Sequence, residues 1–126
     1  MSVFGKNTSV IELTPINFKN GTITHKALEG DKKGMIIYST NWCHFCKITK
    51  KPYQDTSFIL GKSFPMFNLD CIKYSELASS LGINSYPTIK YIDITGKIKR
   101  DFTGERTVEG FLEDICKESR QCPKRK

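Results

Sequence analysis

Two cysteines stand three residues apart in the segment STNWCHFCKITKK, residues 39–51. Such a pair can form a reversible disulfide, supply half of a metal site, or simply pack two thiols. The pair opens a predicted helix, where the first backbone N–H groups lack partners and the helix dipole is positive. A thiolate at Cys43 would be stabilised there, and Cys46 lies one helical turn further on. The spacing therefore predicts an attacking thiolate at Cys43 and a resolving thiol at Cys46.

The rest of the chain gives less support to the other uses of the pair. Zinc takes four ligands, so a half-site at Cys43 and Cys46 needs two more. We predict no metal site, because the remaining candidates form no second close pair; they are Cys71, Cys116, Cys122, His25 and His44. Two packed core thiols are disfavoured, because Trp42 and the junction between strand and helix place the pair at an edge.

The elements on either side of the pair must position it. Residues 34–40 form a continuous, β-rich apolar run, which is typical of a central strand covered on both faces. Helical spacing begins at Cys43, and we expect Ile48 and Phe58–Ile59 to form the buried side of this helix. Pro52 should kink or interrupt it.

The remaining elements complete an α/β pattern. Apolar β-rich runs predict strands, alternation around a Thr-Gly turn predicts a hairpin, and helical spacing predicts two more helices. The expected strands are 9–13, 63–71, 88–94 and 97–102, and the expected helices are 74–82 and 107–119, the last capped by Thr107. Buried strands that alternate with helices indicate a mixed sheet with helices on both faces.

The chain of 126 residues carries a net charge of +7, and its last ten residues, KESRQCPKRK, hold five Lys or Arg and one Glu. We expect one domain over 1–118 and a basic tail over 119–126. A solvated tail is the simpler interpretation, and an electrostatic contact with nucleic acid or an acidic partner is the alternative. No basic helix carries interleaved exposed aromatic residues, which disfavours nucleic-acid binding.

The expected cellular location rests on targeting signals that the sequence lacks. We find no secretory signal, no retention signal and no apolar run long enough to span a membrane. Five cysteines, an odd number, cannot form a closed disulfide framework. These features favour a reducing, cytoplasmic location. The abundance of Lys, Ile and Asn hints at an AT-rich genome; in a large DNA virus, the virion or viral factory would become the expected location.

Five segments together resemble the thioredoxin superfamily, closest to the thioredoxin domains of protein disulfide isomerases. They are VIELTPINF (10–18), MIIYSTNWCHFCK (35–47), NLDC (68–71), LGINSYPTIKYI (81–92) and FTGERTVEGFLEDI (102–115). The resemblance implies a central mixed β-sheet flanked by helices. It also implies that Cys43 is the nucleophile and Cys46 the resolving cysteine. A glutaredoxin is a weaker match, because no Gly-Gly pair follows Pro87.

The same resemblance assigns roles to residues around the pair. Pro87 matches the family's cis-proline, which with Tyr86 would present backbone groups to a bound peptide; an ordinary proline at a strand start is the alternative. Trp42 matches the family's tryptophan, which would form a surface platform near the pair; simple filling of the core is the alternative. Arg106 matches a family arginine thought to tune the resolving cysteine; a solvated charge in a loop is the alternative.

The chain also departs from the family pattern. Ile37 stands where the family usually carries a buried Asp or Glu that moves protons for the resolving cysteine, so water or another group replaces it, or resolution is slower. Between the cysteines, His44 could favour the thiolate at Cys43 and make the disulfide more oxidising, and Phe45 would add exposed apolar surface. Alternatively, both are tolerated surface residues. Pro52 falls one residue later than the family's helix proline.

These features predict a thiol–disulfide oxidoreductase that needs no bound cofactor. Its substrates would be protein disulfides or dithiols, and an unidentified reductase or oxidase would restore the pair. The rival hypothesis is a thioredoxin-like binding or packaging protein with little turnover. Cys71 should be a buried small hydrophobe, whereas spacing alone leaves open whether Cys116 and Cys122 form a bridge.

Overall fold

A five-stranded mixed sheet forms the centre of the computed structural model, which describes residues 2–5, 8–120 and 122. The first three strands in spatial order are parallel, and the last two run antiparallel to their neighbours. In that order they are β1 (Ile11–Glu12), β5 (Met66–Asp70), β4 (Gly34–Ser39), β6 (Thr88–Ile92) and β7 (Ile98–Asp101). A small antiparallel ribbon of β2 (Phe18–Lys19) and β3 (Thr22–Ile23) lies outside this sheet.

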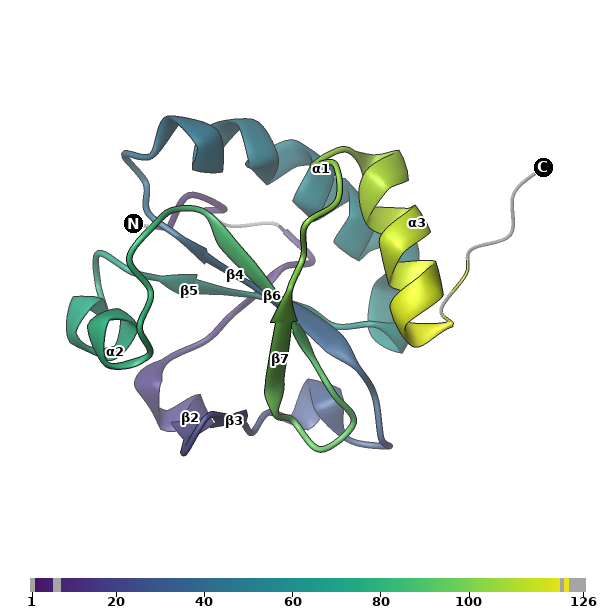
Figure 1. Ribbon diagram of the computed structural model, residues 1–126, viewed down its shortest axis with the longest axis horizontal. Helices are drawn as coiled ribbons and strands as arrows, with labels where there is room; N and C mark the ends of the chain where they lie inside the picture. The colour runs from purple at the N-terminus through teal and green to yellow at the C-terminus, as the bar shows by residue number, and fades with distance from the viewer. Residues whose placement is uncertain (1, 6–7, 121, 123–126) are drawn as a thin grey trace.

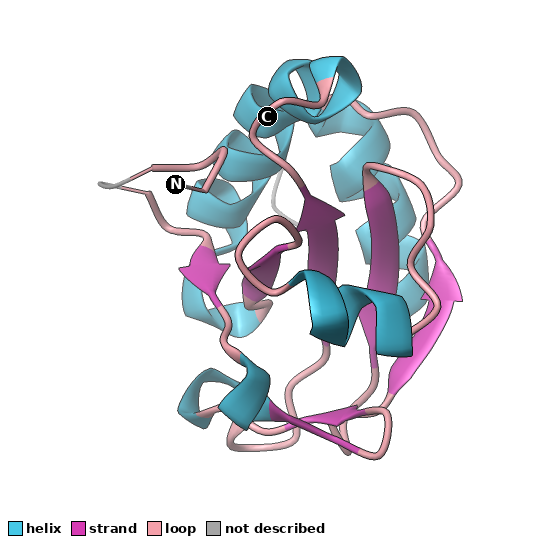
Figure 2. Cartoon of the chain, turned by 90° about the vertical axis from the view of Figure 1, so that its left-hand side faces the viewer, coloured by secondary structure: helices cyan, strands magenta, loops and turns pink. Residues whose placement is uncertain are grey.

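Helices cover both faces of the sheet. Helices α1 (His44–Leu60) and α3 (Val108–Ser119) pack on one face, and α2 (Ser75–Ser80) lies on the other, as the two views show together (Figures 1 and 2). Single 3-10 turns at η1 (Pro15–Asn17), η2 (Lys26–Leu28) and η3 (Gly61–Ser63) join the longer elements. The predicted mixed sheet with helices on both faces is confirmed.

The central strand β4 explains why its sequence is apolar without alternation. All six of its residues are buried, because side chains from successive positions enter two different cores. Met35 and Ile37 join the core under α1 and α3, whereas Ile36 and Tyr38 join the core on the α2 side. A strand buried on both faces cannot slip in register without exposing apolar side chains, so its carboxyl end is firmly fixed.

The predicted buried side of α1 is wrong. Ile48, Phe58 and Ile59 are exposed, although they are among the most apolar residues of the helix. The buried face instead follows the spacing of Cys46, Thr49, Tyr53, Thr56, Ser57 and Leu60. The hydroxyls of its threonines and serine bond carbonyl oxygens of their own helix, which removes the cost of burying them. Small polar residues can therefore pack against the sheet here.

The expected cap and hairpin are confirmed, whereas the expected effect of Pro52 is partly wrong. The helix α1 continues through Pro52, so this proline does not interrupt it. The Thr107 hydroxyl caps α3 as predicted, and β6 and β7 form the predicted hairpin. The turn between them needs Gly96, because its φ is +87° and an added Cβ would lie 2.3 Å from the carbonyl oxygen of Ile23.

The end of α3 lies close to the predicted domain boundary. The helix continues to Ser119, and Arg120 follows in a left-handed conformation. Most of the predicted basic tail, residues 121 and 123–126, lies outside the described residues. Within the described part of the chain, no helix combines the length and apolar character needed to cross a membrane.

Candidate active site

Cys43 lies where the sequence predicts it, at the junction between β4 and α1. It is the N-cap residue of α1, with extended backbone angles (φ −75°, ψ 121°). Its Sγ accepts a hydrogen bond from the backbone N–H of Cys46 at 3.2 Å. This N–H is one of the donors that a helix start leaves without a partner inside the helix. The sulfur therefore takes the place that a hydroxyl or carboxylate oxygen usually occupies at an N-cap.

A loop from the other side of the site lies against the same sulfur. The peptide bond between Tyr86 and Pro87 is cis, as the resemblance predicts. The Cys43 thiol donates to the carbonyl oxygen of Tyr86 at 3.4 Å. Only 6% of Cys43 is exposed, so this loop and the helix start leave the sulfur a narrow opening to solvent. A group bonded to the Cys43 sulfur would therefore lie close to the segment of Tyr86 and Pro87.

Cys46 is fully buried beneath Cys43, and both thiols are free in this structure. Burial, with a smaller contribution from the hydrogen bond to Cys43, raises the pKa of the Cys46 thiol. A backbone hydrogen bond with Thr40 opposes this rise without cancelling it. At neutral pH, Cys46 is therefore a protonated thiol that must lose its proton before it can attack.

No carboxylate stands at position 37, where the family resemblance led us to expect a buried acid. Ile37 stands there, fully buried within the core under α1. No motif in the sequence pointed to Thr40, whose hydroxyl is buried without a hydrogen-bond partner among the described residues. The one signal available was its place as a polar residue at the end of an apolar run. Thr40 therefore contacts Cys46 through its backbone, and its own side-chain hydroxyl is buried without a partner.

Exposed apolar side chains lie close to Cys43 in the sequence. Trp42 is 65% exposed and meets Tyr86 edge-on at 6.3 Å between ring centroids. This exposure argues against core filling, while a role for Trp42 as a surface platform stays a prediction. Phe45 is 61% exposed, as predicted, and its ring meets that of His44 at 5.5 Å. Ile48, one turn after Phe45, extends this apolar surface along α1.

Arg106 lies apart from these contacts. It is exposed in the loop before α3 and forms no hydrogen bond or ion pair with a described residue. This agrees with a solvated loop charge in the present conformation, while its proposed influence on Cys46 stays a prediction. Among the described residues, no three His, Cys, Asp or Glu side chains gather in a way that could hold a metal ion.

The other thiols divide into one buried residue and one bridge. Cys71 is buried at the end of β5, as expected. Burial raises the pKa of its thiol to about 12, although a side-chain hydrogen bond with Tyr86 opposes this rise. Tyr86 thus contacts Cys71 through its side chain and Cys43 through its backbone, a link the sequence did not reveal. Cys116 and Cys122 form the disulfide that spacing had left open.

Comparison with known proteins agrees with this geometry. The sequence model of the Thioredoxin family matches residues 9–117, nearly the whole described chain. This chain belongs to the thioredoxin family. It is 29% identical over 110 residues to protein disulfide isomerase-like 2-2 of Oryza sativa, covering 86% of this chain and 28% of that protein. It is also 29% identical over 91 residues to thioredoxin of Borreliella burgdorferi, covering 71% of this chain and 78% of that one.

Solved structures show the same fold. Human ERp44 superposes with a TM-score of 0.74 at 18% identity, covering 90% of this chain and 30% of that one. The Trx4 domain of ERdj5 gives a TM-score of 0.70 at 18% identity, covering 89% of this chain and 96% of that domain. The thioredoxin fold and a distant homology to domains of the isomerase type are confirmed. The chain spans less than a third of the length of its isomerase relatives but most of the bacterial thioredoxin.

Proposed function

We propose that this chain is a thiol–disulfide oxidoreductase that acts on protein disulfides or dithiols through Cys43 and Cys46. Membership of the thioredoxin family and the pair at the start of α1 support exchange chemistry. The observation that carries the proposal is the Cys43 sulfur, which accepts a helix-start N–H and lies against the Tyr86 carbonyl beside cis-Pro87. That arrangement places the Cys43 sulfur at a helix start and beside the backbone of the cis-proline loop.

Exchange would proceed in two displacements at sulfur. The Cys43 thiolate attacks one sulfur of a substrate disulfide, and the other substrate sulfur leaves as a thiolate that takes up a proton. Cys46 then loses its proton and attacks the Cys43 sulfur of the mixed disulfide, which releases the second substrate thiolate. The substrate has gained two electrons, and Cys43 and Cys46 are joined. The pair carries the electrons itself, and a reductase or oxidase must restore its starting state.

The surroundings of the pair favour polypeptide substrates. Trp42, Phe45 and Ile48 are exposed apolar residues close to Cys43 in the sequence, and apolar surface that is contiguous marks sites of protein contact. The backbone of Tyr86 and Pro87 lies beside Cys43, where it can meet an extended chain.

We propose a cytoplasmic location as well, or the virion or viral factory if the source is a large DNA virus.

A thioredoxin-like binding or packaging protein with little turnover is the second candidate. The buried Ile37 and the raised pKa of Cys46 favour it, because both slow the release of a mixed disulfide. The exposed apolar side chains around Trp42 would then serve binding alone. Thiol labelling at neutral pH separates the two candidates: rapid alkylation of Cys43 supports the oxidoreductase, whereas two slow, ordinary thiols support the binding protein.

Two single variants test the proposed roles in reduction of a model protein disulfide such as that of insulin. Cys43→Ser should abolish turnover, whereas Cys46→Ser should accumulate a mixed disulfide that survives gel electrophoresis without reductant. The matched control is the double variant Cys116→Ser/Cys122→Ser, which removes a cysteine pair at the end of α3 and should keep wild-type turnover. Full activity in Cys43→Ser would make the assignment wrong.

A further inference from the structure

A disulfide joins the last turn of α3 to the residues that follow it. Cys116 is half-buried in the helix, and Cys122, six residues later, is exposed. The left-handed conformation of Arg120, whose N–H bonds the Cys116 carbonyl oxygen at 2.9 Å, turns the chain back toward Cys116. Since one of the two sulfurs belongs to an exposed residue, a thiolate from solvent can reach this bond.

This second pair lies far from Cys43. Lys33 donates to the carbonyl oxygen of Glu118 at 3.1 Å, so the end of α3 contacts the residue that precedes β4. Cys43 follows the opposite end of β4, and a six-residue strand spans about 17 Å. Figure 1 likewise shows the start of α1 and the end of α3 on opposite sides of the molecule. The two pairs therefore cannot exchange electrons directly within one molecule.

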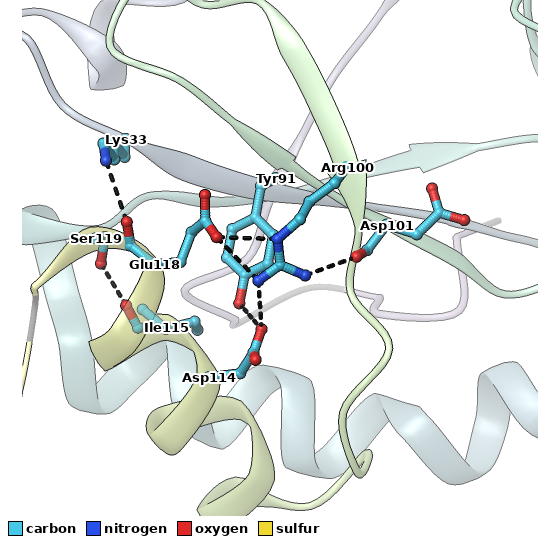
Figure 3. A network of polar contacts seen from close by, with 8 residues as sticks. All are labelled: Lys33, Tyr91, Arg100, Asp101, Asp114, Ile115, Glu118 and Ser119. Atoms are coloured by element: carbon cyan, nitrogen blue, oxygen red, sulfur yellow. Dashed lines mark hydrogen bonds and ion pairs between the residues drawn. The ribbon is translucent and has the colours of Figure 1, made fainter.

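The end of α3 is held in place without help from the disulfide. Arg100 on β7 forms ion pairs with Asp114 at 3.2 Å and with Glu118 at 2.9 Å, one turn apart on α3 (Figure 3). The Tyr91 hydroxyl bonds the same Asp114 carboxylate, and the Arg100 guanidinium lies over the Tyr91 ring. Breaking the disulfide would leave these contacts intact. Its reduction should thus leave α3 in place.

Positive charge flanks the pair. Lys117 adjoins Cys116 in the sequence, and Arg120 comes two residues before Cys122. Nearby cations stabilise thiolates, and stabilised thiolates make the corresponding disulfide easier to reduce. The Glu118 carboxylate acts in the opposite sense, but Arg100 pairs with it.

We propose that Cys116 and Cys122 form a second redox couple, separate from Cys43 and Cys46, whose disulfide accepts two electrons from a dithiol. One thiolate of the dithiol attacks the exposed Cys122 sulfur, and Cys116 leaves as a thiolate that takes up a proton. The second thiol of the donor loses its proton and attacks the mixed disulfide, which frees Cys122. The donor becomes a disulfide, and the pair becomes two thiols.

The double variant Cys43→Ser/Cys46→Ser tests this couple without the proposed active site. The folded variant is equilibrated in graded mixtures of reduced and oxidised glutathione, quenched in acid and alkylated, and its intact mass counts the free thiols. Because this variant lacks the active-site pair, failure here is distinct from failure of the proposed function. The complementary variant Cys116→Ser/Cys122→Ser should show the transition of Cys43 and Cys46 alone.

We expect one reversible two-electron transition, which peptide mapping assigns to Cys116 and Cys122, with the same midpoint as in the wild-type protein. Dithiothreitol should reduce the bond in the folded variant within about tenfold of its rate in urea, because its exposed sulfur is open to attack. A folded-state rate slower than that, or thiols that never join in oxidised glutathione, would overturn the proposal.

Discussion

Release of the mixed disulfide should depend steeply on pH, because the attacking group is a buried neutral thiol. Burial raises the pKa of Cys46 to about 12, and no carboxylate stands at Ile37 to accept its proton. A raised pKa means that the thiolate is scarce at neutral pH and grows tenfold with each pH unit below that pKa. We therefore expect the rate of resolution to rise about tenfold per unit between about pH 7 and pH 9.

The expected slowing at neutral pH follows from the same pKa. Relative to an ordinary thiol with a pKa of about 8.5, the thiolate fraction of Cys46 falls by roughly 3,000-fold. A more basic thiolate is a better nucleophile, with a Brønsted coefficient of about 0.4–0.5, which recovers roughly 25- to 55-fold. The net effect is a resolving step about 55- to 120-fold slower than that of an unperturbed thiol in the same geometry.

A single-turnover measurement can isolate this step. A peptide thiol is first joined to Cys43, and its release is followed after rapid transfer to buffers of different pH. The informative variant is Ile37→Asp, which restores a carboxylate at the family's acid position and should raise the neutral-pH rate and flatten the profile. Ile37→Asn is the matched control, since it is similarly polar and similar in size but cannot accept the proton.

The outcome that refutes this reasoning is a flat wild-type profile between about pH 7 and pH 9. It would mean that Cys46 ionises readily in the mixed disulfide, or that another group already accepts its proton. An equal rise in rate for Ile37→Asp and Ile37→Asn would instead show that loosened packing, not proton transfer, speeds the step. Circular dichroism and the urea midpoint of each variant must first establish that it is folded, since Ile37 is fully buried.

Three further predictions concern stability. Burial raises the pKa of the thiols of Cys46 and Cys71, so the unfolded chain loses these protons at a lower pH than the folded chain. The free energy of unfolding should therefore fall above about pH 9, by about 1.4 kcal/mol per pH unit for each group. A constant urea midpoint up to about pH 10.5 would contradict this. Tyr53→Phe should cost about 1 kcal/mol in urea unfolding, because the buried hydroxyl donates to the Phe67 carbonyl oxygen at 2.7 Å. Thr107→Ala should cost about 1 kcal/mol, because its hydroxyl accepts a helix-start N–H at 2.9 Å, and Thr107→Ser should restore most of the loss.

The sequence predicted the sheet and the position of the pair well, because local signals specify both. A continuous apolar run can be satisfied only by a strand covered on both faces, which is how β4 lies. The Thr-Gly turn before Lys97 and the cap at Thr107 depend on backbone conformation and short-range hydrogen bonds, which residue type reveals directly. The cis bond before Pro87 was expected from family resemblance and not from local chemistry.

Other features could not be predicted, because they depend on contacts between distant segments. The bond between Cys116 and Cys122 requires the chain to turn back at Arg120, a left-handed conformation that residue type does not specify there. The raised pKa of the Cys46 thiol and the unpaired hydroxyl of Thr40 likewise result from burial in the folded structure. Spacing along a sequence shows which groups can meet but not how much solvent remains around them.

The error over α1 also bears on function. Apolar side chains at Ile48 and Phe58 suggested a buried face, yet the fold buries threonines and a serine that bond their own helix, and exposes the apolar residues. Near the start of the helix, this choice exposes Phe45 and Ile48, which lie close in sequence to Trp42 and Cys43. Exposed apolar area has no benefit for folding, and we propose that Phe45, Ile48 and the nearby Trp42 are covered by a partner. A protein substrate held there would bring its disulfide to Cys43.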